Sequence, residues 1–189
     1  MKNLKSIAVA LVVALGTLTA AAQTQDIDTS RSKIEWVGEK VTGQHEGTIK
    51  FSSGALIFNN GNLVSGKFSV DMNSIEVTDL KAGEGKEKLE GHLKADDFFG
   101  SSIYPTSSLN FTSVKKKSAN VYTVKANLTI KNITKPVQFD LKVADGVATT
   151  QFEVDRTKYG IEYKSGSIFD GLGDNMIYDD FKLTVTLYY

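Results

Sequence analysis

Apolar and polar residues alternate along most of this chain, and such alternation is the pattern of strands that bury one face. Between Tyr122 and Lys131, every second residue is apolar, and the residues between them are mostly polar or charged. The same period of two recurs in segments 67–73, 137–143, 148–154 and 183–187, and in shorter form at Ile34 with Trp36 and at Ile49 with Phe51. The pattern therefore predicts a chain built mainly of half-buried strands.

Turn-forming residues separate several of these strands. Asn59-Asn60-Gly61 and Asp145-Gly146 suit tight hairpins, because Asn, Asp and Gly tolerate a positive φ. Ser118-Ala119-Asn120 is a looser signal of the same kind. Short strands at near-regular spacing with such turns predict an antiparallel barrel or sandwich. With no internal repeat, low-complexity segment or linker between them, we expect a single domain.

One segment has the spacing of a short amphipathic helix. Leu89 and Leu93 stand one helical turn apart among charged residues in 86–93, and Pro105 prevents the helix from continuing beyond the next turns. We expect this helix to cap one end of the sheet. A second irregular stretch, 165–180, is rich in Gly and Asp and is expected to close the same end or the opposite one.

The first 22 residues have the composition of a secretory signal peptide. Lys2 and Lys5 precede an apolar run over 7–18 that is short for a membrane anchor, and small residues follow at 20–22. We expect cleavage near Ala22, a mature domain over 23–189, and a periplasmic or secreted protein without stable membrane insertion. An uncleaved anchor is the alternative. The absence of cysteine excludes both disulfides and a lipoprotein attachment site.

Charge and residue types argue against several classes of partner and chemistry. Loss of 1–22 leaves two more acidic than basic residues, so nothing suggests the basic face that nucleic acid requires. The chain has only two histidines, His45 and His92, and we expect no metal site. No nucleophile motif or phosphate-binding loop is present, so we expect no catalytic residues, no cofactor and no enzyme activity.

Five ordered blocks of the chain resemble the YceI family of bacterial periplasmic lipid-binding proteins. They are Ser32-Lys33-Ile34-Glu35-Trp36, Gly66-Lys67-Phe68 with Asp71, Ser74 and Ile75, His92 to Phe99 followed by Tyr104-Pro105, Asn127 to Val137, and Asp155-Arg156 with Tyr159-Gly160-Ile161. The chain departs from the family at Asn127 and Asn132, where Gly is usual, and at Ala95, where Ser is frequent.

The resemblance implies an all-β fold, namely an eight-stranded antiparallel barrel of lipocalin-like shape with one short helix capping an end. It also implies a long apolar cavity that holds an isoprenoid, a fatty-acyl lipid or a similar amphiphile. The aromatic residues by themselves leave two interpretations open, because a barrel of about eight strands either fills its interior or holds one ligand. The family likeness favours the cavity. A homodimer is compatible with the sequence.

On this basis we expect a ligand-binding set drawn from the strands, the helix and the blocks that match the family. It consists of Trp36, Phe51, Phe68, Leu89, His92, Leu93, Phe98, Phe99, Tyr104, Phe111, Leu128, Phe139, Phe152, Arg156 and Tyr159. His92, Tyr104, Arg156 and Tyr159 are candidates for contact with a polar headgroup. For Arg156 a structural ion pair with Asp97 or Asp155 is the alternative.

Two other classes of function remain as alternatives. One is an exported enzyme that acts on a lipid or quinone, which would need a catalytic pair near the cavity mouth. The other is a ligand-free interaction module of the stress response, which would expose an apolar patch or a flat sheet edge.

Overall fold

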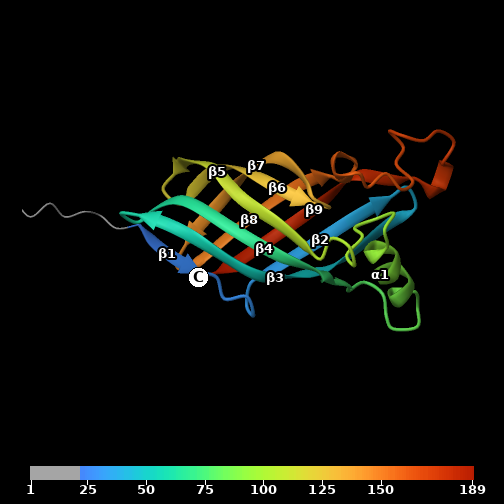
Figure 1. Cartoon of the computed structure of the whole chain (residues 1–189), viewed down its shortest axis with the longest axis horizontal. Coiled ribbons are helices and arrows are strands. Elements are labelled where there is room, and N and C mark those ends of the chain that lie inside the picture. Colours follow the sequence, from blue (N-terminus) through green and yellow to red (C-terminus); the bar gives the residue numbers. More distant parts are fainter. Residues whose placement is uncertain (1–21) are drawn as a thin grey trace, which may run out of the picture.

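The structure, a computed structural model, describes residues 22–189. The predicted signal peptide therefore lies outside the described residues, apart from Ala22. The strands are β1 (Gln23–Asp26), β2 (Lys33–Lys40), β3 (Gly43–Asn59), β4 (Asn62–Val77), β5 (Thr106–Ser118), β6 (Val121–Ile130), β7 (Ile133–Ala144), β8 (Val147–Asp155) and β9 (Ile177–Tyr188). One α-helix, α1 (Lys86–Lys94), and two short 3₁₀ helices, Arg156–Tyr159 and Gly173–Asn175, complete the elements. Figure 1 shows these elements with the long axis of the molecule horizontal.

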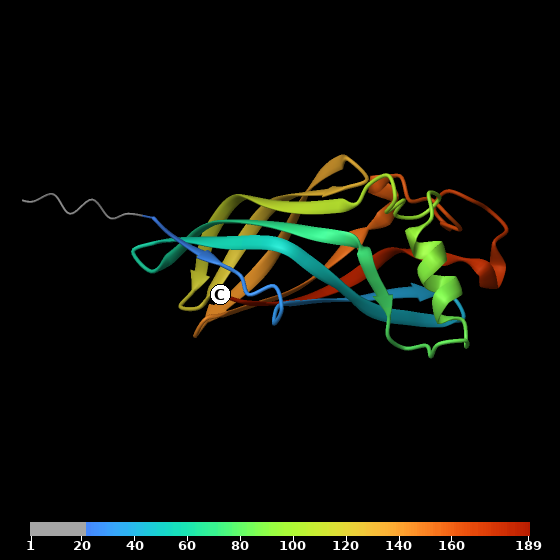
Figure 2. The ribbon, with the colours of Figure 1, turned by 60° about the horizontal axis from the view of Figure 1, so that its bottom comes forward.

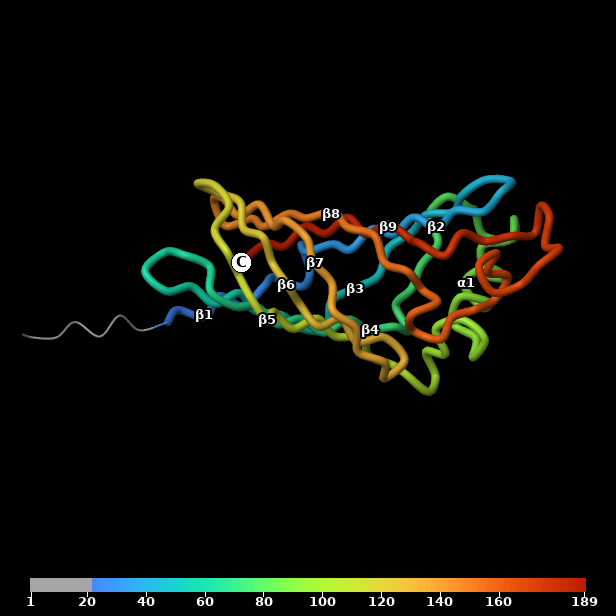
Figure 3. Tube along the Cα trace, turned by 90° about the horizontal axis from the view of Figure 1, so that it is seen from above, coloured from blue at the N-terminus to red at the C-terminus, as the bar shows by residue number. Residues whose placement is uncertain are grey.

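The strands form a closed antiparallel barrel. Their order is β3-β2-β9-β8-β7-β6-β5-β4, and pairing of β4 with β3 closes the ring. Strand β1 pairs with residues 55–58 of β3. It lies on the same edge of β3 as β2, which pairs with residues 43–49. Seen from above, β5, β6 and β7 cross the barrel side by side (Figure 3). The eight-stranded barrel with one short helix that the resemblance implied is thus confirmed.

Both tight hairpins predicted from the sequence have the expected backbone. Asn60 and Gly61 have φ of 51° and 73° between β3 and β4, and Asp145 and Gly146 have 54° and 75° between β7 and β8. A two-residue hairpin turn in which both central residues have a positive φ is a type I′ turn, and its twist matches that of the flanking strands. These turns therefore fix the registers of two of the hairpins that build the barrel.

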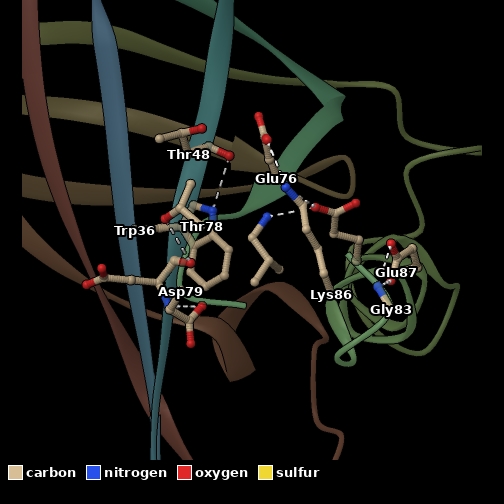
Figure 4. Close-up of polar contacts among 11 residues, drawn as sticks. Trp36, Thr48, Glu76, Thr78, Asp79, Gly83, Lys86 and Glu87 are labelled. Carbon is tan, nitrogen blue, oxygen red and sulfur yellow. Dashed lines mark hydrogen bonds and ion pairs between the residues drawn. The ribbon is translucent and has the colours of Figure 1, made fainter. Parts of the chain in front are cut away.

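Helix α1 and the segment between β8 and β9 lie together at one end of the barrel (Figures 1 and 2). The rings of His92 in α1 and Tyr163 in that segment are 4.5 Å apart, centroid to centroid. On the other side of α1, Glu90 Oε1 accepts a hydrogen bond from the Val77 N–H at 2.9 Å, and Lys86 Nζ donates to Glu76 at 3.0 Å (Figure 4). The two irregular segments therefore cap the same end, which we call the helix end.

Within residues 22–189, no helix has the length and apolar character needed to cross a membrane.

Candidate ligand cavity

An apolar cavity of about 130 Å³ lies inside the barrel at the helix end. Its walls include the predicted residues Trp36, Leu93, Phe98, Phe99, Leu128 and Arg156. They also include residues outside the predicted set, namely Ile34, Ile49, Val70, Met72, Ile75, Ser107, Ile130, Phe181 and Leu183. Ile34, Ile49, Val70 and Ile130 are period-two neighbours of the predicted residues Trp36, Phe51, Phe68 and Leu128. Extending the inward face of each strand by one step would therefore have found these four.

The indole of Trp36 forms one wall of the cavity because the opposite strand carries a glycine. Trp36 pairs with Gly47 across β2 and β3. A Cβ at Gly47 would lie 2.5 Å from Cζ2 of the indole, so only glycine leaves room for the ring. The indole Nε1 donates to the carbonyl oxygen of Thr48 at 3.2 Å (Figure 4), which satisfies the one polar atom of the ring.

Aromatic rings from the loop after α1 line the cavity at the helix end. Phe98 is buried, its ring centroid lies 5.3 Å from that of Phe99, and Phe99 meets Phe181 of β9 at 6.2 Å. Lys131, in the turn between β6 and β7, donates to the carbonyl oxygens of Asp96 and Phe98 at 2.9 and 2.8 Å. The loop after α1 is thereby held over the barrel end.

The guanidinium of Arg156 is buried, with 2% of the residue exposed, and it also contacts the cavity. It donates to the carbonyl oxygens of Ile161, Ile177 and Tyr178 at 2.8, 3.0 and 3.1 Å. Burial lowers the pKa of the guanidinium from its usual range, and the negative charge of Asp179 opposes that shift. Because most of its donors are occupied by the backbone, the side chain mainly ties β9 to the segment after β8.

The acidic partner of Arg156 differs from both predicted ones. Asp179 Oδ1 lies 3.6 Å from the guanidinium. Asp97 is exposed, and Asp155 instead accepts from the Thr157 N–H at 3.0 Å and pairs with Lys158 at 3.3 Å. The sequence-based expectation of a clamp with Asp97 or Asp155 was therefore wrong. The true partner lies more than twenty residues further along the chain, where only the β8–β9 pairing brings it close.

Two polar atoms near the cavity are left without a hydrogen bond in the described part of the chain. Ser107 Oγ is buried in the cavity wall, and His92 Nε2 is buried beside Phe98 and Tyr163. A buried hydroxyl without a partner costs about 1–3 kcal/mol. Ser107 is therefore a point in an otherwise apolar wall where a ligand oxygen would be favoured.

The remaining predicted residues lie outside the cavity wall. Phe51, Phe68, Phe111, Phe139 and Phe152 form a layer across the barrel, which we call the phenylalanine belt. Leu89 packs against the core from α1, and Tyr104 is half-buried after the loop. Tyr159 is 1% exposed, and burial raises the pKa of its phenol to about 12. The structure thus separates the predicted set into a cavity group, a belt group and peripheral residues.

No cluster of three or more His, Asp or Glu side chains suited to a metal ion occurs within residues 22–189. His45, at the start of β3, bonds through Nδ1 to Asp79 Oδ2 at 2.8 Å and links this strand to the segment before α1.

A family model described as a YceI-like domain matches residues 25–189. The chain therefore belongs to the YceI family, and the five sequence blocks identified that family correctly. Protein YceI of Escherichia coli O157:H7 and its namesake from Shigella flexneri are each 31% identical over 97 residues. These alignments cover 51% of this chain and 48% of each relative, so the chain spans about half the length of the curated relatives it matches.

Solved structures share the fold at low sequence identity. Burkholderia cenocepacia BcnA superimposes with a TM-score of 0.70 at 19% identity, covering 86% of this chain and 99% of BcnA. A polyisoprenoid binding domain from Saccharophagus degradans gives 0.57 at 15% identity, covering 87% and 96%. The Campylobacter jejuni YCEI protein gives 0.54 at 14% identity, covering 100% and 98%. At these identities the likeness establishes the architecture alone.

Proposed function

We propose that this barrel binds the apolar chain of an isoprenoid lipid, polyprenyl or quinone-like, or of another amphiphilic lipid, and serves as its carrier or store. The observation that supports the proposal is the cavity inside the barrel, whose wall is apolar except for Ser107 and Arg156. The name of the Saccharophagus degradans domain, a polyisoprenoid binding domain of the same fold, points to the same class of ligand.

The chemistry of the wall suits a hydrocarbon ligand. Each methylene moved from water into such a site contributes roughly 0.8 kcal/mol, so affinity arises without ionic contacts. Ser107 Oγ supplies one hydrogen-bonding position for a hydroxyl or carbonyl oxygen of the ligand. A carrier or store of this kind would act after export, with the mature domain over 23–189 in the periplasm or outside the cell.

The enzyme alternative is not favoured by the contacts of its candidate residues. His92 packs against the rings of Phe98 and Tyr163, and Arg156 donates to three carbonyl oxygens. Each side chain therefore has a structural role in holding the helix end together. We accordingly propose a binding function without turnover.

The test uses Trp36, because it is the single tryptophan of the chain and lies in the cavity wall. The purified mature protein is extracted with organic solvent, and the extract is examined by mass spectrometry for a stoichiometric lipid. The extracted protein is then titrated with prenyl alcohols and fatty acids while the Trp36 emission is followed. We expect a saturable blue shift or quenching. The absence of both a co-purified lipid and a saturable emission change would contradict the proposal.

A further inference from the structure

Five phenylalanines from five different strands meet in one continuous layer inside the barrel. Phe51 of β3 lies 6.0 Å from Phe68 of β4, and Phe68 lies 5.8 Å from Phe111 of β5, measured between ring centroids. Phe111 lies 6.1 Å from Phe139 of β7, which stacks on Phe152 of β8 at 4.7 Å. The phenylalanine belt thus spans most of the circumference of the barrel.

Small residues beneath the rings hold the belt in place. A Cβ at Gly66 would lie 2.8 Å from the ring of Phe111, and a Cβ at Gly54 would collide with the ring of Phe68. Strand β6 separates β5 from β7, yet it carries Ala126 opposite Phe111, so the rings of Phe111 and Phe139 meet across it. Glycine and alanine at these positions leave room for the rings to meet across the lumen.

The belt stands directly behind the cavity. On β3 the wall residue Ile49 is followed two positions later by Phe51, and on β4 the wall residue Val70 is preceded two positions earlier by Phe68. On these two strands the inward-facing series therefore passes from cavity wall to belt in a single step away from the helix end.

Beyond the belt, several inward-facing side chains are fully buried. Leu56, Val124 and Ala148, from β3, β6 and β8, have an exposed fraction of 0%. Accessible surface includes the wall of any internal void wide enough for a water molecule, so no such void touches these side chains. The apolar cavity at the helix end therefore does not extend to these residues.

We propose that the phenylalanine belt is the floor of the binding site and sets the length of hydrocarbon that this barrel encloses. This inference rests on the proposed function. The volume in front of the belt, about 130 Å³, is close to the ~150 Å³ engineered cavity that admits benzene. The site thus takes about one to two isoprene units of a chain, and the remainder of a longer ligand stays outside the cavity.

The first experiment measures affinity against length. The extracted protein is titrated with prenol, geraniol, farnesol and geranylgeraniol, which contain one to four isoprene units, with Trp36 emission as the readout. Burial of a whole unit increases affinity at least about tenfold. We expect such a gain from prenol to geraniol and a change below about threefold from geraniol to geranylgeraniol.

The second experiment opens the floor. In the wild-type protein, affinity is expected to reach a plateau at geraniol. Phe111→Ala is expected to shift this plateau to ligands longer by at least one isoprene unit, so that farnesol binds at least about tenfold more tightly than geraniol. Phe111→Leu, a smaller change, is the variant to use if the alanine variant does not fold. Phe58→Ala is the matched control, because it removes a ring that stacks on Tyr189 at 5.4 Å, outside the belt. The control is expected to keep the wild-type plateau.

The outcomes separate this inference from the function on which it rests. An affinity that keeps rising tenfold per unit to geranylgeraniol in the wild-type protein overturns the belt as a floor and leaves lipid binding intact. A plateau that does not move in a folded Phe111 variant has the same meaning. No binding at any length overturns the proposed function, and the inference with it.

Discussion

At the scale of single residues, Arg156 shows how a side chain chosen for its charge acts mainly through its hydrogen bonds. It lines the cavity, and the resemblance to the family had made it a candidate for contact with a ligand headgroup. Its bonds to the carbonyl oxygens of Ile161, Ile177 and Tyr178 depend on the path of the segment between β8 and β9. That path has no regular pattern, so the sequence could not reveal these partners.

Replacing Arg156 is expected to destabilise the fold strongly. Arg156→Met leaves three carbonyl oxygens and Asp179 without their partner, which costs about 3 kcal/mol or more in the free energy of unfolding. Arg156→Lys is expected to show a smaller loss in the free energy of unfolding, because an ammonium group can form some of these hydrogen bonds but cannot reproduce the planar guanidinium fork. Urea unfolding followed by circular dichroism measures the loss.

Lys158→Met is the control for this prediction, because Lys158 lies on the same 3₁₀ helix with 65% of its side chain exposed. It is expected to change the free energy of unfolding by less than about 0.5 kcal/mol. An Arg156→Met protein as stable as the wild type would show that the carbonyl contacts contribute nothing to stability.

At the scale of elements, regular alternation of apolar and polar residues predicted several strands. In other strands, β-bulges interrupt this alternation, so the sequence did not reveal them. Strand β5 contains register shifts at Phe111/Ser113 and Lys116/Ser118, and β3 contains one at Phe51/Ser53. Each bulge inserts a residue and reverses the inward and outward positions beyond it. The sequence therefore predicted only a short stretch in the middle of β3, Ile49 to Phe51, and gave no separate signal for β5. Strand β1 is short and mostly exposed, so it carries no apolar face to detect.

The pairing of β2 with β3 makes Gly47 a sensitive position. In Gly47→Ala the new methyl group collides with the Trp36 indole and the Glu76 carbonyl oxygen. We expect the indole to move toward the cavity, with a loss of about 1–3 kcal/mol in stability from overpacking and a reduced affinity for prenyl alcohols. A shifted Trp36 emission maximum in the ligand-free protein reports the movement.

Gly38→Ala is the matched control on β2, because a Cβ there meets no atom within 4 Å. It is expected to keep both the emission maximum and the affinity of the wild-type protein. Equal behaviour of the two alanine variants would contradict the assignment of Gly47 as the residue that makes room for the indole.

At the scale of the whole molecule, large exposed apolar side chains gather at the helix end. Val41, Ile168, Phe169 and Tyr178 are between 43% and 48% exposed. The Val41 N–H donates to the Met176 carbonyl at 3.2 Å, and a bridge from Ser165 to Ile177 joins the loop to β9, so these segments are neighbours. They surround the end of the barrel that contains the cavity.

The carrier form of the proposed function makes a prediction about this end. A carrier must take its ligand from a membrane, and exposed aromatic and aliphatic side chains favour contact with the bilayer interface. The double variant Ile168→Ser with Phe169→Ser is expected to slow transfer of a fluorescent prenyl lipid from vesicles at least about threefold, with unchanged affinity for geraniol in solution. Stopped-flow fluorescence measures the transfer rate.

Val64→Ser provides the comparison at the opposite end, because Val64 is 46% exposed at the β3–β4 hairpin. Its transfer rate is expected to equal that of the wild type. Equal rates in all three proteins would favour storage over transport.

The sequence by itself determined that the chain folds as an antiparallel β-barrel of the YceI family with one short helix, because strand alternation, turn residues and ordered motifs are local features. It also indicated many of the side chains that point inward. Tertiary structure alone decided that five inward phenylalanines meet in a belt, whereas inward residues nearer the helix end leave a cavity. The reason is that period-two alternation fixes the face of a residue, but its height along the barrel depends on register, bulges and the size of its neighbours on other strands.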